Sequence, residues 1–149
     1  MGARQPRYIN VDTTVSGAID TAFTVMSELR DELQEWYDNL PEPFQNGDKG
    51  NQLQEAIDGI SQYADDPPDP DSDLGDLPVT VRSDRKPESR SQRRDDATVY
   101  LTSALEALEA HADTLDEEDE KREGIQELVD TLNEANDAFQ DVTFPGMYS

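Results

Sequence analysis

Cysteine is absent from the 149-residue sequence, and histidine occurs only once. Without cysteine the chain can form no disulfide, no thiolate zinc site and no cysteine nucleophile. Apolar runs are short, and none approaches the ~18 residues that a membrane-spanning helix requires. The N-terminal residues also lack the apolar stretch of a secretory signal. We therefore expect a protein that works without a membrane.

No arrangement of residues predicts an enzyme, because the chain has neither a glycine-rich phosphate loop nor a nucleophile elbow. His111 has no partner motif around it and is interpreted as a surface residue. Asp69, Asp71 and Asp73 alternate like the start of a calcium loop, but the twelfth position of that frame is Thr80 instead of glutamate. Carboxylates on the first predicted helix lack the Glu-x-x-His pairs of a di-metal bundle. We expect no catalytic residue, no specific metal site and no cofactor.

Acidic residues dominate the composition, with 35 Asp and Glu against 12 Lys and Arg and a net charge of −23. Asp outnumbers Glu by 21 to 14, and Arg outnumbers Lys by 9 to 3. This balance is typical of proteins from concentrated salt, because carboxylates hold water and cations while long lysine stems favour aggregation. At ~1 M salt the Debye length is only ~3 Å, so repulsion between carboxylates is largely screened. We expect diffuse cations at the acidic surface and lower stability in dilute buffer.

Four segments show the three- and four-residue spacing of apolar residues that predicts an amphipathic helix. They are residues 13–40, 51–64, 94–112, and a segment that starts at a Thr114–Glu117 capping box and ends near Gln140. Pro41 and Pro43 prevent the first helix from continuing. The predicted fold is therefore all-α, a single domain with two antiparallel helix hairpins over residues 13–64 and 94–141.

The segment between these hairpins, residues 65–93, is predicted to be an extended linker. Its first half is rich in aspartates, whose carboxylates repel one another, and in prolines, which lack a backbone N–H donor. At most one short strand is expected in it, near Val79–Val81. Residues 142–149 form an aromatic tail after the last helix.

Positive charge is concentrated in residues 82–94, which have a local net charge of +4. The basic residues of this segment are Arg82, Arg85, Lys86, Arg90, Arg93 and Arg94. They could lie across acidic helix faces, either of the same chain or of a neighbour, because arginine pairs with carboxylates in a bidentate geometry. They could also contact nucleic-acid phosphates. The first interpretation is favoured, since phosphate affinity falls steeply at high salt.

The apolar side chains of the tail are a second candidate contact, and they are Phe144, Met147 and Tyr148. Either they fold back over the end of the helices, or they anchor the chain to a partner. The sequence leaves both interpretations open.

Several segments resemble a family of small acidic proteins encoded by tailed viruses. They are residues 33–43 (LQEWYDNLPEP), Lys49, residues 53–60 (LQEAIDGI), 77–80 (LPVT), 90–95 (RSQRRD) and 142–148 (VTFPGMY). The resemblance implies a viral origin, here a virus of a salt-loving host. It carries over no activity and no catalytic residue, because the family has none assigned. The strong acidity departs from the usual members.

Three functions remain after these exclusions. The leading prediction is a non-enzymatic viral interaction protein, a virion or assembly component of a tailed virus that infects a halophilic archaeon. It would be made in the host cytoplasm and bind a protein, either itself or another viral protein. The first alternative is an acidic mimic of nucleic acid that inhibits a host defence or DNA-binding protein. The second alternative is nucleic-acid binding through the arginine-rich segment.

Overall fold

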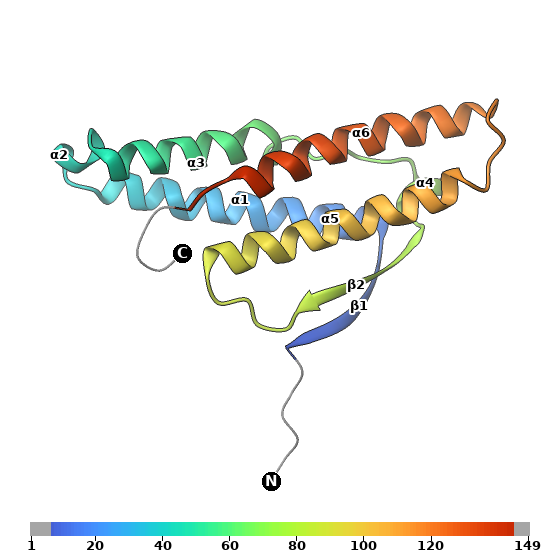
Figure 1. Ribbon diagram of the computed structural model, residues 1–149, viewed down its shortest axis with the longest axis horizontal. Coiled ribbons are helices and arrows are strands. Elements are labelled where there is room, and N and C mark those ends of the chain that lie inside the picture. The colour runs from blue at the N-terminus through green and yellow to red at the C-terminus, as the bar shows by residue number, and fades with distance from the viewer. Residues whose placement is uncertain (1–6, 145–149) are drawn as a thin grey trace, which may run out of the picture.

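The computed structural model describes residues 7–144, which form six helices and two strands (Figure 1). The long helices are α1 (Val15–Asn39), α3 (Asp48–Ala64), α5 (Arg90–Ala112) and α6 (Glu120–Asp141). The short elements are α2 (Glu42–Gln45), α4 (Ser72–Gly75), β1 (Tyr8–Thr14) and β2 (Pro78–Asp84). The fold is mostly helical, as predicted, and it also contains a small sheet. No helix within residues 7–144 has both the length and the apolar character needed to cross a lipid bilayer.

The core lies between the four long helices. Helix α1 packs against α3 and α5, and α6 packs against α5 and α3. The buried stripe of α1 includes Phe23, which meets Phe139 of α6 edge to face with ring centroids 5.5 Å apart. Tyr63 of α3 approaches the same Phe139 ring at 6.5 Å. These apolar stripes are the ones that the residue spacing predicted, since they remove the hydrophobic face of each helix from water.

The sheet is antiparallel and pairs Tyr8 with Asp84 at one end and Thr14 with Pro78 at the other. Side chains of β2 alternate, so that Val79, Val81 and Ser83 are buried, and β2 packs against α5. The expectation of at most one short strand near Val79–Val81 is therefore wrong, because two strands of seven residues each are present. Strand pairing depends on a partner far along the chain, which the local pattern of either segment does not reveal.

Several predicted boundaries also differ from the structure. Residues 65–93 are not an extended linker throughout, since they contain α4, β2 and the first turn of α5. Helix α5 begins at Arg90, four residues earlier than predicted, because Ser89 and Gln92 form a capping box. Helix α6 begins at Glu120 with Asp119 as its N-cap, and the predicted Thr114–Glu117 capping box does not form. Thr114 instead donates its hydroxyl to the His111 carbonyl at 2.6 Å.

Candidate partner-binding surface

Two of the predicted site residues, Arg90 and Arg93, lie across the acidic face of α1. Nη1 of Arg93 is 2.7 Å from a Glu32 carboxylate oxygen, and Nε of Arg90 is 3.5 Å from the other. Arg93 also approaches Glu28 at 3.9 Å. Both arginine side chains are only about a quarter exposed, at 27% and 25%. These two cations therefore join the start of α5 to the chain's own α1 helix and are only partly open to solvent.

The single tryptophan extends this contact. The Arg90 guanidinium lies 5.3 Å from the centroid of the Trp36 ring, and the Lys49 ammonium lies 5.4 Å from it. Both separations are within the range of a cation–π interaction. Trp36 thus reports on the packing of α1 against α3 and α5.

Arg94 is a third internal cation. Its Nη1 donates to the carbonyls of Phe139, Gln140 and Val142 at 3.1, 3.2 and 2.8 Å. No basic residue lies in the last turn of α6, so Arg94 supplies the positive charge that the C-terminus of this helix favours. Its guanidinium also lies 5.5 Å from the ring centroid of Phe144.

The tail is described only as far as Phe144, which is 7% exposed and belongs to the core. For this residue the fold-back interpretation holds. Met147 and Tyr148 lie outside the described residues. The tail therefore offers no described side chain that could anchor a partner.

The other three predicted residues, Arg82, Arg85 and Lys86, are exposed at the end of β2 and in the turn after it. The fold brings Arg7 beside them from the other strand, and we call Arg7, Arg82, Arg85 and Lys86 the basic ribbon end. The guanidiniums of Arg82 and Arg7 lie 5.2 and 5.4 Å from the centroid of the Tyr8 ring. A hollow of about 320 Å³ opens here, lined by Arg7, Asp84, Arg85, Lys86, Glu88 and Gln92.

Arg7 was not among the predicted site residues. It lies in a short basic N-terminal stretch, but only the pairing of β1 with β2 shows that this stretch joins the segment 82–94. Because the register places Tyr8 opposite Asp84, Arg7 reaches the Asp84 carboxylate, with Nε 3.5 Å from it. The signal in the sequence was the positive charge just before β1 and just after β2, which the antiparallel pairing brings to the same end of the ribbon.

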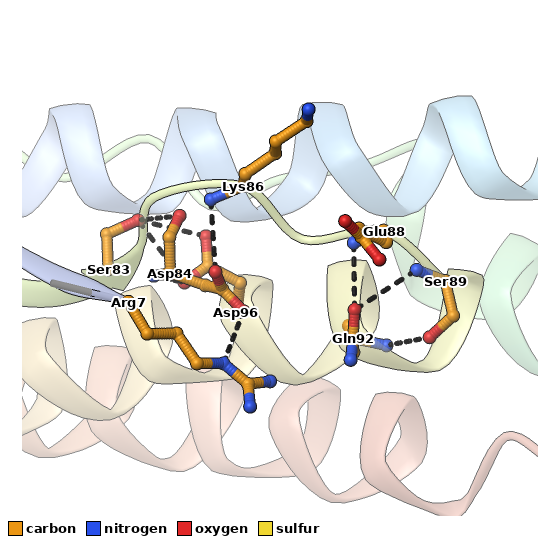
Figure 2. Close-up of polar contacts among 8 residues, drawn as sticks. All are labelled: Arg7, Ser83, Asp84, Lys86, Glu88, Ser89, Gln92 and Asp96. Atoms are coloured by element: carbon orange, nitrogen blue, oxygen red, sulfur yellow. Dashed lines mark hydrogen bonds and ion pairs between the residues drawn. The ribbon is translucent and has the colours of Figure 1, made fainter. Parts of the chain in front are cut away.

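Asp96 of α5 holds the end of the ribbon in place (Figure 2). Its carboxylate accepts hydrogen bonds from the Asp84 backbone N–H at 2.7 Å and from the Ser83 hydroxyl at 3.0 Å. Partial burial raises the pKa of Asp96, these two hydrogen bonds oppose the rise, and the nearby Asp84 charge adds to it. The Lys86 backbone N–H in turn donates to Asp84 at 3.0 Å. The turn that carries the exposed cations is thus built on two linked aspartates.

No protein-family model, curated protein or solved structure matches the chain. The resemblance to proteins of tailed viruses therefore stays a prediction.

In contrast to the basic ribbon end, the solvent face of α6 is acidic and carries a continuous row of carboxylates. They recur at three- and four-residue steps and are all exposed: Glu120, Glu123, Glu127, Asp130, Glu134, Asp137 and Asp141. At 1.5 Å per residue the row is ~32 Å long, with one charge per ~5 Å. Among residues 7–144, no three His, Asp or Glu side chains are placed so that they could hold a metal ion. The row is a charged face without a coordination site.

Proposed function

We propose that the protein is a non-enzymatic interaction protein that binds a partner protein through the basic ribbon end, and that it serves as a virion or assembly component of a tailed virus from a salt-loving host. One observation carries the binding part. On a chain of net charge −23, Arg7, Arg82, Arg85 and Lys86 gather at one exposed corner. Arg7 pairs with Asp84 and still remains 59% exposed, whereas Arg30, Arg90 and Arg94 pair with carboxylates of their own chain at 14–27% exposure. The viral part rests on the resemblance alone.

The use of arginine at this corner supports a protein partner. At ~1 M salt only contacts within ~3 Å escape screening, so attraction must come from close hydrogen-bonded pairs rather than long-range charge. Arginine forms such pairs with carboxylates through its planar fork. Nucleic-acid binding through the segment 82–94 is a weaker proposal, because Arg90, Arg93 and Arg94 are engaged within the chain and phosphate affinity falls with salt.

Mass spectrometry of purified virus particles tests the proposed role. We expect the protein in a fixed stoichiometric ratio to the major particle proteins. A Lys86→Glu variant should be incorporated poorly, whereas Lys121→Glu, which changes the charge equally at an exposed lysine on α6, should behave like the wild type. Absence from particles would reject the virion role, and equal incorporation of both variants would reject the basic ribbon end as the contact.

The carboxylate row of α6 favours a second candidate function, the acidic mimic of nucleic acid. This function ranks second because the row is less densely charged than DNA. A DNA duplex carries one charge per ~1.7 Å of its axis, whereas the row carries one per ~5 Å. Competition with a DNA-binding host protein would test this function. If it holds, neutralising Glu127, Asp130 and Glu134 together should abolish the inhibition, and unchanged inhibition would reject it.

A further inference from the structure

Strand β1 has an open edge. Strand β2 packs against α5, and β1 lies beyond it as the outer strand of the ribbon (Figure 1). Within the described part of the chain the sheet contains these two strands only. Along an antiparallel ladder, pairs that exchange backbone hydrogen bonds alternate with pairs that do not. Arg7 and Arg85 form a hydrogen-bonded pair, since the Arg85 N–H donates to the Arg7 carbonyl at 2.7 Å, so the next pair, Tyr8 with Asp84, is not hydrogen-bonded. The backbone groups of Tyr8, Asn10 and Asp12 therefore point away from β2, toward the open edge.

This edge lacks the features that usually prevent strands from pairing with another chain. Natural edge strands carry lysine, proline or a bulge. Strand β1 has none of these, and Asp12 is its single charged residue in a chain of which 32% is charged. Tyr8 and Ile9 are 43% and 40% exposed, which makes them two of the four large apolar side chains exposed within residues 7–144. A two-stranded sheet is also marginal by itself and gains stability from further strands.

Charge decides which surface two copies can bring together. Each copy carries −23, so an approach through the helical faces places carboxylates against carboxylates. The basic ribbon end lies beside β1, because Arg7 precedes the strand and Arg82 is paired with Asn10. Repulsion between two copies is therefore lowest where their β1 edges meet.

We infer that β1 pairs antiparallel with β1 of a second copy, centred on Asn10, to form a four-stranded sheet. This inference rests on the proposed interaction function and names a second copy as the partner. The register uses the outward backbone groups of Tyr8, Asn10 and Asp12 in both chains. It places Ile9 opposite Val11 of the second copy. It also brings Asp12 of the second copy opposite Tyr8, whose ring the Arg7 and Arg82 guanidiniums flank.

A cysteine at the centre of this register provides the first test, because the chain has no other cysteine. Directly opposite residues in a hydrogen-bonded pair lie ~5.5 Å apart at Cα, within the range that a disulfide spans. In molar salt under mild oxidation, Asn10→Cys should give a covalent dimer. Thr80→Cys, which is exposed one strand further from the axis, should not. Equal cross-linking of the two variants, or none with Asn10→Cys, would overturn the register.

Size-exclusion chromatography with light scattering in molar salt provides the second test. The wild type should elute at twice the 16.7 kDa chain mass. Asn10→Pro removes only a donor on the open edge, so it should leave the β1–β2 ladder intact and raise the dissociation constant of the dimer roughly tenfold or more. Circular dichroism checks its fold. If proline disturbs the strand, Asn10→Lys replaces it, since it keeps every backbone group and places like charges opposite each other.

The outcomes separate this inference from the proposed function. A wild type that stays monomeric, or that dimerises equally with Asn10→Pro and Asn10→Lys, overturns β1 pairing. If that monomer is still stoichiometric in particles, the proposed function survives with a different partner. If the dimer forms and depends on Asn10 but particles lack the protein, the pairing holds and the virion role fails.

Discussion

Replacement of Arg94 tests how much of the basic segment stabilises the fold. The side chain is 14% exposed, so its charge is held in a mostly dry environment. It donates to carbonyls of Phe139, Gln140 and Val142 at the C-terminus of α6 and joins that terminus to α5. The last turn of an α-helix has no following turn to supply donors, so its carbonyls need other partners. Here the Val142 N–H reaches the Phe139 carbonyl at 3.3 Å, and Arg94 supplies the further donor. Arg94 therefore acts as a cap supplied from another helix.

The expected size of the effect follows from these contacts. A hydrogen bond to a charged group contributes about 1.5–3 kcal/mol, and a cation at a partly buried helix C-terminus contributes up to ~2 kcal/mol. Because the contributions overlap, Arg94→Ala should lower the free energy of unfolding by about 3 kcal/mol. Arg94→Lys keeps the charge but loses the fork, so it should cost about half as much, ~1.5 kcal/mol.

Urea unfolding in molar salt measures this, with fluorescence of the single Trp36 as the signal. Urea is preferred because guanidinium would change the screening. Arg82→Ala is the matched control, because Arg82 is exposed and its described contact is with the Tyr8 ring. This substitution should lower the free energy of unfolding by less than ~0.5 kcal/mol. If Arg94→Ala loses no more than the control, then Arg94 is not a structural cap and is available to a partner.

Three further predictions concern the fold. The free energy of unfolding should rise from dilute buffer to ~1 M salt, because screening relieves repulsion at net charge −23, and a protein most stable without salt would contradict this. Burial raises the pKa of Asp96 above its usual value of 3.8, so its contribution to stability is present below that pH and is lost as pH rises through the raised pKa. Over that pH rise, the free energy of unfolding of Asp96→Asn should therefore increase relative to that of the wild type. Asp96→Ala should lower the free energy of unfolding by about 1–2 kcal/mol at any pH, because it leaves the Asp84 N–H without its acceptor. Asn136 is 8% exposed and its side-chain oxygen has no hydrogen-bond partner. Asn136→Leu should therefore raise the free energy of unfolding by about 1–2 kcal/mol, measured by thermal unfolding. A decrease would show that the amide is hydrogen-bonded in the folded protein.

The long helices could be predicted from the sequence, because each buries one apolar stripe whose spacing is set by the helix itself. Strand β1 could not. Its residues favour β-structure locally, but a strand becomes stable only when it finds its partner, and here the partner begins at Pro78. The start of α6 was misplaced for a related reason. Both Thr114 and Asp119 could cap a helix, and which one does depends on how the α5–α6 turn packs.

The division within the arginine-rich segment was also hidden. Counting charges shows six cations in residues 82–94 but does not show which of them face solvent. The chain changes from strand and turn to helix at Ser89. Cations before that residue are exposed, and those after it lie in the first five residues of α5 against α1 and α6. The signal for this change was present as the Ser89-x-x-Gln92 capping box. This capping box divides the segment at Ser89.

Salt dependence distinguishes self-pairing from nucleic-acid binding by its sign. Binding to phosphates releases counterions, so its affinity falls as salt rises, with a slope set by the number of contacts. Pairing of two copies that each carry −23 works against mutual repulsion, which salt screens, so its affinity should rise over the same range. Backbone hydrogen bonds and the Ile9–Val11 contact proposed for the dimer do not depend on that screening. Light scattering and a nucleic-acid binding curve recorded on one salt series should therefore move in opposite directions. A dimer that dissociates as salt rises would show that ion pairs, and not the β1 edge, hold the two copies together.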